Sequence, residues 1–457
     1  MLNHHRPAQE MPSPRSTCLL SADTRPAGTG TSRPVTRRKG HRSPASFGRR
    51  IALVLGASLA AACSAPGASG GEPASETAAV IPGVEVLLRD SLHLVQGKRV
   101  GLITNHSGRD RAGTSTIDLL HGAPDVRLVA LFSPEHGIRG AAAAGERVDS
   151  SVDEATGLPI HSLYGETRVP SDQMLDGIDV LVYDIQDAGA RVYTYVWTMA
   201  LSAEKAGSLG IPFVVLDRPD PVRGDVVQGN ILDPEFRSFV GQHTVALRYG
   251  LTPGELLQLL AGEGYLQADV TVVPMDGWRR DMWFDETGIE WVNPSPNLRT
   301  VDATLLYTGT VFFEATNLSE GRGTDAPFQL VGAAWLDADA AVAQLQSTGL
   351  EGVTFTATER TVEPGQKWGG QTIPMIHVEV TDRNVVYPAA IGLHMLRVIH
   401  SLHPDDFEWR DRFLNLLSGT DRTRAAVEMA SGVERLLEEW GREAERFGAL
   451  REQYLVY

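Results

Sequence analysis

A carboxylate and an imidazole stand side by side in the run Leu131-Phe132-Ser133-Pro134-Glu135-His136-Gly137. The apolar residues 126–132 predict a strand, and the Ser-Pro pair ends it. In an α/β protein, ligands bind at the carboxyl ends of the strands. Glu135 and His136 are therefore candidates for general acid–base chemistry on a bound ligand.

Polar side chains also follow three other predicted strands, at residues 99–104, 178–185 and 211–216. One such group is ordinary, because strand ends are exposed in many proteins. Four groups in succession favour one cleft along one edge of the sheet. The further groups are Asn105 with His106, Asp184 with Gln186 and Asp187, and Asp217 with Arg218.

Strands that alternate with helices at residues 115–121 and 194–209 predict an α/β fold, a Rossmann-like domain with a mostly parallel sheet. A Pro-rich loop at residues 293–297 suggests the boundary of this domain. We expect a catalytic domain over 83–297 and a smaller α+β C-terminal domain over 298–457. The smaller domain combines strands at 330–336, 353–358 and 375–380 with helices at 338–347, 388–400 and 423–447, the last one packed through its apolar residues 429–440.

The first 62 residues have the pattern of an export signal. Arg49 and Arg50 precede a short apolar run, and Ala-Ala-Ala precedes Cys63, as in a bacterial lipobox. Residues 63–82 are rich in Gly, Ser, Ala and Pro and predict a flexible tether. We expect an exported protein on the outer face of a bacterial membrane, held there by lipid on Cys63, or a secreted one. Cys18 is the other cysteine, so export would leave no thiol for a disulfide, a thiolate metal site or a nucleophile.

The charge of the chain is divided unequally. Residues 1–62 hold 10 of the 41 Lys and Arg and 2 of the 57 Asp and Glu, which leaves 31 and 55, a net −24, for the rest. A body this acidic, without a basic patch, excludes nucleic acid as a partner, and no protein partner is evident. An anionic substrate would need its own positioned arginine or lysine.

Several common kinds of site are missing from the sequence. It has no Gly-x-Gly-x-x-Gly after the first strand, no Walker-type phosphate loop, no Gly-x-Ser-x-Gly elbow that follows a strand and no His-Glu-x-x-His motif. A metal held by His106, His136 and Asp184 has no supporting spacing. We therefore expect a site without metal or cofactor.

Five motifs together resemble the bacterial exo-β-N-acetylmuramidase family, a former domain of unknown function now classed among glycoside hydrolases. The resemblance runs from about residue 84 to the C-terminus. Asp220 and Val192 depart from residues common in that family. The motifs are Phe132-Ser-Pro-Glu-His-Gly137, Tyr183-Asp-Ile-Gln-Asp-Ala-Gly-Ala-Arg-Val-Tyr-Thr-Tyr195, Leu216-Asp-Arg-Pro219, Trp291-Val-Asn-Pro-Ser-Pro-Asn297 and Phe313-Glu-Ala-Thr-Asn-Leu-Ser-Glu-Gly-Arg-Gly-Thr324.

The resemblance implies an enzyme that releases N-acetylmuramic acid from the non-reducing ends of peptidoglycan fragments such as MurNAc-GlcNAc, in cell-wall turnover or recycling. It also implies that Glu135 is the catalytic glutamate, with the active site in the Rossmann-like domain. The alternative is a non-catalytic lipoprotein that binds muropeptides or sugars in the same cleft.

Glycoside hydrolysis usually needs two carboxyl groups beside the scissile bond. Glu314 follows the apolar run 311–313, and burial there would raise its pKa and suit it to acid work. Asp184 and Asp187 are competitors. An internal salt bridge between Glu314 and Arg322 is as plausible as catalysis.

Substrate contacts can be proposed for the lactyl carboxylate and for the sugar. Arg191 and Arg322 lie in glycine-containing motifs and could form a bidentate fork with the carboxylate. Tyr193 could stack on a sugar ring, and the alternation of Tyr193, Tyr195 and Trp197 suggests a strand or an extended loop. The polar candidates for ring hydroxyls or the acetamido group are Asn105 and His106, with Asp184 beside them.

Overall fold

The computed structural model describes residues 79–140, 146–147 and 149–457. The predicted signal segment and most of the predicted tether, Cys63 included, lie outside the described residues. Val80 and Ile81, which the sequence assigned to the tether, belong to the folded body. Val80 is fully buried and its amide donates to the carbonyl of Thr287 at 2.8 Å, while Ile81 forms a β-bridge with Asp276.

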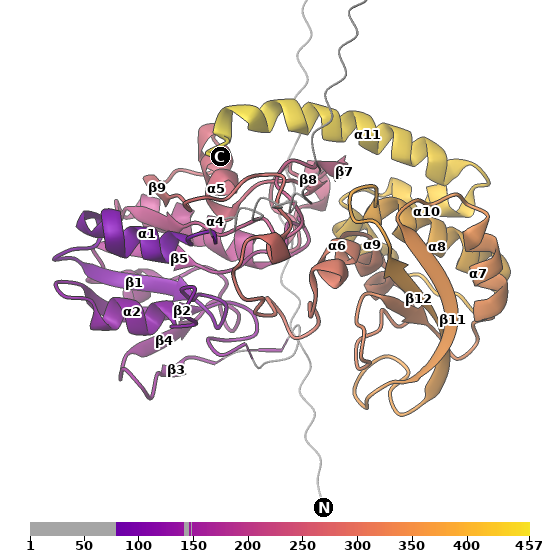
Figure 1. Cartoon of the computed structure of the whole chain (residues 1–457), viewed down its shortest axis with the longest axis horizontal. Coiled ribbons are helices and arrows are strands. Elements are labelled where there is room, and N and C mark those ends of the chain that lie inside the picture. Colours follow the sequence, from indigo (N-terminus) through magenta and orange to yellow (C-terminus); the bar gives the residue numbers. More distant parts are fainter. Residues whose placement is uncertain (1–78, 141–145, 148) are drawn as a thin grey trace, which may run out of the picture. The chain divides into compact units, whose positions relative to one another are not determined.

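A seven-stranded sheet in the order β3-β4-β2-β1-β5-β6-β9 forms the first half of the described chain (Figure 1). Every neighbouring pair is parallel except β3 with β4. The predicted α/β class with a mostly parallel sheet is confirmed. The strands are β1 (Arg99–Thr104), β2 (Arg127–Ser133), β3 (Ser151–Val152), β4 (Pro159–Ser162), β5 (Val180–Asp184), β6 (Phe213–Leu216) and β9 (Val270–Val273).

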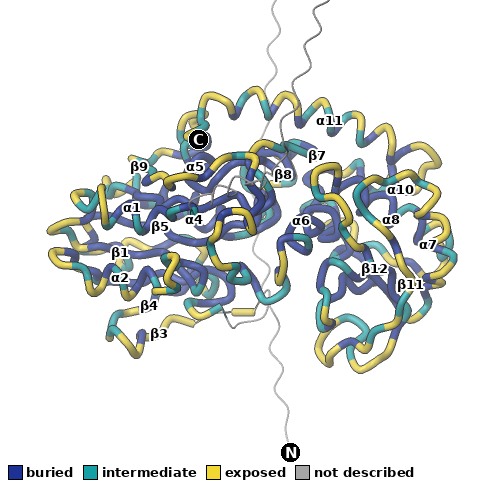
Figure 2. Tube along the Cα trace, in the orientation of Figure 1, coloured by how far each residue is buried: buried dark blue, intermediate teal, exposed yellow. Residues whose placement is uncertain are grey.

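The central strands are buried on both faces, as helical crossovers require. Every residue of β5 and β6 is buried, and β5 appears dark blue in Figure 2. Side-chain caps begin several of the helices around the sheet; the side chain of Thr252, for example, accepts from the amide of Glu255 at 3.2 Å. These helices are α1 (Gly83–Asp90), α2 (Thr116–Gly122), α3 (Asp172–Leu175), α4 (Tyr195–Ser208) and α5 (Pro253–Gly262), with 3₁₀ turns η1 (Leu92–Leu94), η2 (Pro234–Phe236) and η3 (Phe284–Glu286).

Helix α4 corrects the expectation of a strand or extended loop around Tyr195 and Trp197. Both side chains are fully buried within the helix, and Tyr193 lies in the turn before it. The helix is buried on most of its surface, so aromatic residues two apart can both be buried without a strand.

The second half of the described chain contains an antiparallel sheet in the order β10-β12-β11. Helices pack against this sheet. The first half of the chain contributes a separate two-stranded antiparallel ribbon, formed by β7 and β8. The predicted α+β character of this part is confirmed. Its elements are α6 (Val301–Thr310), η4 (Val311–Ala315), β10 (Leu330–Gly332), α7 (Ala338–Gln346), β11 (Val353–Thr361), β12 (Thr372–Val380), α8 (Pro388–Leu402), α9 (Asp411–Ser418), α10 (Arg422–Glu428), α11 (Gly432–Arg451) and η5 (Glu452–Tyr454), and the ribbon is β7 (Gln228–Ile231) with β8 (Ala246–Arg248).

Two glycines let α6 and α8 cross in close contact. A Cβ added to Gly309 would lie 1.8 Å from the carbonyl oxygen of Pro388, and one added to Gly392 would lie 2.3 Å from that of Gly309. The crossing fixes the end of α6, where η4 begins.

The predicted single helix over residues 423–447 is wrong. The chain forms α10 and α11, separated at residues 429–431. Gly432 starts α11 at a position where a Cβ would lie 2.2 Å from the carbonyl oxygen of Ala426. Met429 is 49% exposed instead of packed, whereas Val433 and Trp440 are buried as predicted.

Helix α11, yellow in Figure 1, connects the second half back to the first. Its Glu443 accepts a hydrogen bond from the amide of Ile231 in β7 at 2.9 Å. Its Arg451 donates to the carbonyls of Gly224 at 2.6 Å and Asp225 at 3.1 Å. None of the described helices is long and apolar enough to cross a membrane.

Candidate active site

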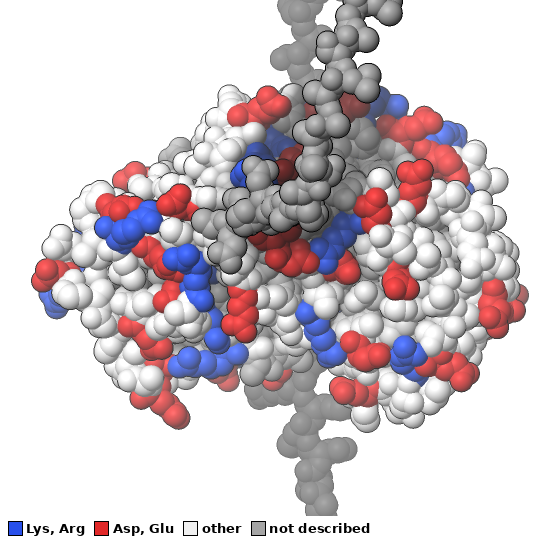
Figure 3. Space-filling view, in the orientation of Figure 1, with Lys and Arg blue, Asp and Glu red and all other residues white. Residues whose placement is uncertain are grey.

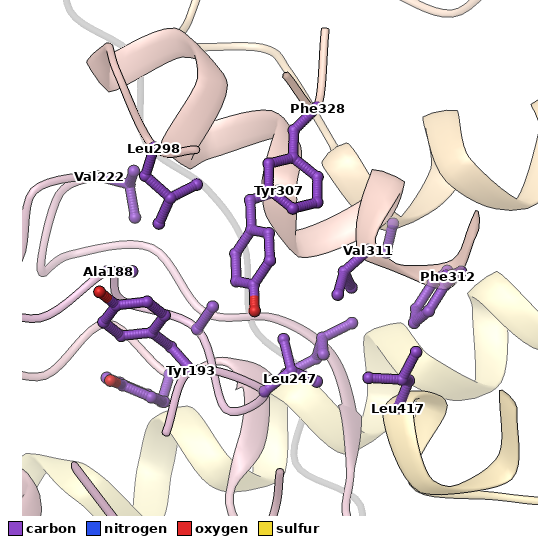
Figure 4. Close-up of a cluster of buried hydrophobic side chains, with 14 of the residues drawn as sticks. Ala188, Tyr193, Val222, Leu247, Leu298, Tyr307, Val311, Phe312, Phe328 and Leu417 are labelled. Atoms are coloured by element: carbon purple, nitrogen blue, oxygen red, sulfur yellow. The ribbon is translucent and has the colours of Figure 1, made fainter. Parts of the chain in front are cut away.

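A cavity of about 850 Å³ lies beside the carboxyl end of β2 and is lined by residues from both halves of the described chain. Its apolar lining belongs to the cluster drawn in Figure 4, where Tyr193, Tyr307, Val311 and Phe328 gather. The charged residues on its wall are Glu135, Glu146, Arg168, Arg299, Glu314, Glu320, Arg322, Glu363, Lys367 and Arg410.

Glu135 stands two residues after β2, and its side chain is held by the segment that begins α4. Thr194 Oγ1 donates to Glu135 Oε2 at 2.7 Å. The hydroxyl of Tyr195 donates to the main-chain carbonyl of Glu135 at 3.2 Å and to that of Pro294 at 3.0 Å. Glu135 exposes 9% of its surface, so these donors orient a carboxylate that is mostly shielded from water.

The chain turns sharply after Glu135. His136 and Gly137 both adopt left-handed backbone conformations, with φ of 68° and 76°. This conformation is unfavourable for a histidine, so surrounding contacts must hold it. The His136 ring lines the cavity and packs edge-to-face with Tyr195 at 6.4 Å between centroids.

Tyr164 and Thr194 both act on Glu135. Burial, the charge of Glu135 and a hydrogen bond to Glu135 together raise the pKa of Tyr164 to about 12. The phenol therefore stays protonated at neutral pH and serves as a donor.

Glu314 lies on η4, in the second half of the described chain, and also lines the cavity. Val311, Phe312 and Phe313 before it are buried, as the sequence predicted. Arg322 Nη2 contacts Glu314 Oε1 at 2.6 Å. Burial raises the pKa of Glu314 and the charge of Glu320 adds to this, while Arg322 opposes it.

The salt bridge of Glu314 extends into a network. Arg322 Nε lies 3.0 Å from Glu320 Oε1, and Lys367 Nζ lies 3.0 Å from Glu320 Oε2. Lys367 also donates to the carbonyl of Phe313 at 2.8 Å. The two interpretations of Glu314 are therefore compatible, because its salt bridge with Arg322 forms on the cavity wall.

Comparison with known proteins agrees with this geometry. The N-terminal model of the exo-β-N-acetylmuramidase NamZ family matches residues 100–302, and the C-terminal model matches residues 305–457. The chain belongs to the exo-β-N-acetylmuramidase NamZ family. The predicted split at residues 297 and 298 falls close to the boundary between the two models, although the exact boundary stays a prediction.

Relatives of known name or structure support the assignment. The chain is 43% identical over 376 residues to the peptidoglycan β-N-acetylmuramidase NamZ of Bacillus subtilis, which covers 82% of this chain and 91% of that protein. Two crystal structures of DUF1343 family proteins from Bacteroides fragilis are similar, with TM-scores of 0.78 and 0.66 at 35% and 30% identity. Each covers 83% of this chain and 99% of the other. The predicted family and activity class, a glycoside hydrolase, are confirmed, and the non-catalytic alternative is not favoured.

The NamZ-family cavity gathers five of the predicted site residues. Glu135, His136, Tyr193, Glu314 and Arg322 all line it. Their roles in catalysis and binding stay predictions, and the distance between the two carboxyl groups is left for experiment.

Asp184 does not reach the cavity. It is fully buried, with Arg218 Nη2 at 3.0 Å, the Arg218 Nε closer still, and the Thr116 hydroxyl on the same carboxylate. Its competitor Asp187 is also fully buried, bound to the hydroxyl of Tyr249, and burial raises its pKa to about 6. We correct both assignments: these carboxylates are closed off from a substrate by their partners.

Arg191 is likewise enclosed. Its guanidinium donates to the carbonyls of Asn230 at 2.8 Å, Val245 at 3.0 Å and Ser418 at 2.8 Å, and none of its surface is exposed. Burial lowers its pKa to about 9, although the charges of Glu443 and Asp233 oppose this. The expected contact with a lactyl carboxylate is therefore wrong, since the fork is already occupied by main-chain oxygens.

Asn105 and His106 lie behind the cavity wall. Asn105 Oδ1 accepts from the amide and hydroxyl of Ser107 at 2.9 and 2.6 Å, and Asn105 is 1% exposed. His106 Nε2 contacts the carbonyl of Asn293 at 2.7 Å, and burial lowers its pKa. They hold the loop after β1 instead of facing the cavity, which corrects their predicted role.

Sequence reasoning missed Tyr164, Arg168, Phe239, Lys367 and Arg410, all of which line the cavity. Tyr164 and Arg168 follow β4, a four-residue strand without a strong apolar pattern. Thr194 lay inside a motif already recognised and could have been found there. Among the described residues, no group of three or more His, Cys, Asp or Glu side chains comes together to hold a metal ion.

Proposed function

We propose that this protein releases N-acetylmuramic acid from the non-reducing ends of peptidoglycan fragments such as MurNAc-GlcNAc. One observation carries the proposal: the glutamate of the Ser-Pro-Glu-His-Gly motif lines a large cavity in a chain of the exo-β-N-acetylmuramidase NamZ family. The Bacillus subtilis relative is named for β-N-acetylmuramidase activity on peptidoglycan.

Glu135 acts at the scissile bond in this proposal, and Glu314 is the second carboxyl group. Glu135 is oriented by Thr194, and Glu314 has a raised pKa, which suits a group that must carry a proton near neutral pH. His136 closes the turn beside Glu135. A protonated acid on one side and an ionised carboxylate on the other is the arrangement that glycoside cleavage uses.

Glu135→Gln tests the proposal. The substitution keeps the acceptor for Thr194 but cannot transfer a proton, so kcat on a chromogenic β-muramide should fall by about 10³-fold or more. Circular dichroism and thermal unfolding should match wild type. Glu146→Gln, on the same cavity wall, is the matched control and should retain most activity. If wild type releases no muramic acid from MurNAc-GlcNAc, the proposal is wrong.

The pH profiles of the variants assign the roles of the two acids. Loss of the alkaline arm of kcat/KM in Glu314→Gln would identify Glu314 as the proton donor. Loss of the same arm only in a Glu135 variant with residual activity would give that role to Glu135. Proton NMR of the first-formed anomer then gives the stereochemical course.

We also propose that the protein is exported and anchored by lipid on Cys63. The support is the sequence pattern alone: paired arginines, an apolar run from Ile51 to Leu59 and three alanines before the cysteine. In the native host, Cys63→Ser should move the protein from the membrane fraction to the soluble exported fraction. Unchanged membrane association would argue against the anchor.

A further inference from the structure

The cavity wall is rich in cations for a protein whose body is strongly acidic. On the face shown in Figure 3, basic and acidic side chains are interspersed over the described residues. Arg168, Arg299, Arg322, Lys367 and Arg410 nevertheless line one cavity. The question is which of them is available to a substrate.

Three of the five are engaged by the protein itself. Arg322 is bound by Glu314 and Glu320, and Lys367 by Glu320 and main-chain carbonyls. Arg299 donates to the carbonyls of Pro296 at 3.3 Å and Thr324 at 3.1 Å.

Arg168 is held differently. Its guanidinium carbon lies 4.1 Å from the ring centroid of Phe239 and 5.4 Å from that of Tyr164. Those two rings pack against each other at 5.8 Å. Stacking engages the flat face of a guanidinium and leaves the N–H edge for a planar anion. Within the described part of the chain, no carboxylate forms a salt bridge with Arg168.

Arg168 is also connected to the candidate catalytic group. The hydroxyl of Tyr164 interacts with both Glu135 and Arg168, and all three side chains line the cavity. Only one side chain thus separates the guanidinium from Glu135. An anionic group on the sugar whose glycosidic bond is cleaved could therefore contact Arg168 while that bond lies beside Glu135.

The distinguishing chemistry of the proposed substrate is such a group. N-acetylmuramic acid is N-acetylglucosamine with a lactyl ether on O3, and its carboxylate is the sole charge on the sugar. A guanidinium fork is the side chain best matched to a carboxylate, because it donates two parallel hydrogen bonds.

We propose that Arg168, stacked on Phe239, binds the lactyl carboxylate and sets the preference for muramic acid over N-acetylglucosamine. The inference rests on the proposed function and assigns its specificity to one residue. Arg168 thus takes the carboxylate-binding role that the sequence suggested for Arg191, whose Nη1 and Nη2 atoms donate to main-chain carbonyls.

Arg410 also lines the wall without a salt bridge among the described residues, and unlike Arg299 it makes no side-chain hydrogen bond to a carbonyl there, so it serves as the matched control. It precedes α9 and also borders an adjoining groove of about 430 Å³ together with Asp411, Arg412, Phe413 and Leu416. Its charge lowers the pKa of the neighbouring Lys367. The charge of Arg410 therefore acts on the salt-bridge network that Lys367 forms with Glu320.

The test compares wild type, Arg168→Gln and Arg410→Gln on two substrates, a chromogenic β-muramide and its lactyl methyl ester. The ester keeps the shape and removes the charge. Wild type should prefer the free acid by about 10²-fold or more in kcat/KM, the usual scale for losing one partner of a shielded charge pair. Arg168→Gln should lose that preference through slower cleavage of the acid, and Arg168→Lys should restore part of it. Arg410→Gln should keep the wild-type preference.

A second readout uses binding alone. Free N-acetylmuramic acid should inhibit wild type more strongly than N-acetylglucosamine does, and Arg168→Gln should bring the two inhibition constants together. A general loss of folding would weaken both sugars and would not change their ratio.

The outcomes separate the two proposals. If wild type cleaves the muramide but Arg168→Gln retains the preference for the acid in both readouts, Arg168 does not read the carboxylate. Collapse of the preference in Arg410→Gln instead would transfer the role to Arg410 and overturn the inference. Failure of wild type to cleave the muramide would contradict the proposed function itself.

Discussion

Two carboxylate–arginine pairs in this protein have the same chemistry and opposite surroundings. Asp184 and Arg218 meet at the end of β5, with 0% and 3% of their side chains exposed. Glu314 and Arg322 meet on the cavity wall, with 21% and 18% exposed. The sequence placed both Asp184, at a strand end, and Glu314, after an apolar run, among the candidate site residues, and only Glu314 lines the cavity.

The difference lies in what completes each pair. The Asp184 carboxylate also accepts a hydrogen bond from the hydroxyl of Thr116, and Arg218 Nη2 donates as well to the carbonyl of Arg109 at 2.7 Å. That pair joins the end of β5 to α2 and to the loop after β1, so it fastens the sheet edge. The pair of Glu314 extends toward Glu320 and Lys367 and stays open to a ligand. A carboxylate–arginine pair therefore indicates a functional site only when one side of it remains accessible.

The largest expected effect comes from breaking the enclosed pair. Arg218→Met leaves Asp184 charged and buried without its cation, so the free energy of unfolding should fall by about 3–5 kcal/mol. Urea unfolding followed by circular dichroism measures this. Arg89→Met, which removes an exposed pair with Asp90, is the control and should change stability by less than about 1 kcal/mol. Equal effects of the two substitutions would refute the distinction.

Breaking the open pair should affect activity first. Glu314→Gln keeps the size and an acceptor for Arg322 but removes the acid, so kcat on a β-muramide should drop by about 10²-fold. The unfolding midpoint should stay near that of wild type. Glu363→Gln, on the same cavity wall, should leave kcat nearly unchanged. A variant of Glu314 that is fully active but unstable would show that this pair, too, is only structural.

A third carboxylate sharpens the comparison, because it is enclosed without a cation. Asp217 accepts from the hydroxyl of Thr252 at 2.7 Å, the amide of Gly254 at 2.9 Å and the hydroxyl of Tyr457 at 2.8 Å. Burial raises its pKa to about 7. Because this pKa is higher in the folded state than in the unfolded state, protonated Asp217 stabilises the fold. The contribution is complete below about pH 4, the ordinary pKa of aspartate, and is lost as the pH rises to about 7.

Thermal unfolding from pH 4 to 8 tests this smallest effect. The melting temperature of wild type should decrease across the interval, and Asp217→Asn should decrease less. The slope should not vanish, because burial also raises the pKa of Asp187 to about 6 and that of Asp220 to about 7. Asp276→Asn, an exposed control, should follow wild type. An identical slope in Asp217→Asn would contradict the raised pKa.

Within the parallel sheet, the sequence predicted the strands that are mostly buried and missed those that are partly exposed. β1, β2, β5 and β6 are apolar runs, and each was expected within a few residues of its place. β4 and β9 are short and partly exposed, and neither has a strong pattern. Because β4 was not predicted, Tyr164 and Arg168, which follow it and line the cavity, were not predicted as site residues either.

The site residues show the same limit. Glu135 and Glu314 were each identified from a local pattern, a strand end and an apolar run. Asp184 and Arg191 had equally suggestive neighbours, yet the residues that enclose them, such as Thr116, Arg218 and Ser418, come from distant parts of the chain. Those long-range contacts decide whether a polar group faces a ligand or a carbonyl, and a single sequence does not reveal them.

Because α11 contacts residues of the first half of the chain, it affects when that half can make all of its native contacts during synthesis. All strands of the parallel sheet are made before α6, but Arg451 supplies the donors for the carbonyls of Gly224 and Asp225, and the hydroxyl of Tyr457 reaches Asp217. A nascent chain that ends after β9 leaves those polar groups unsatisfied. The sheet domain can therefore make these contacts only after α11 and the residues that follow it have been synthesised.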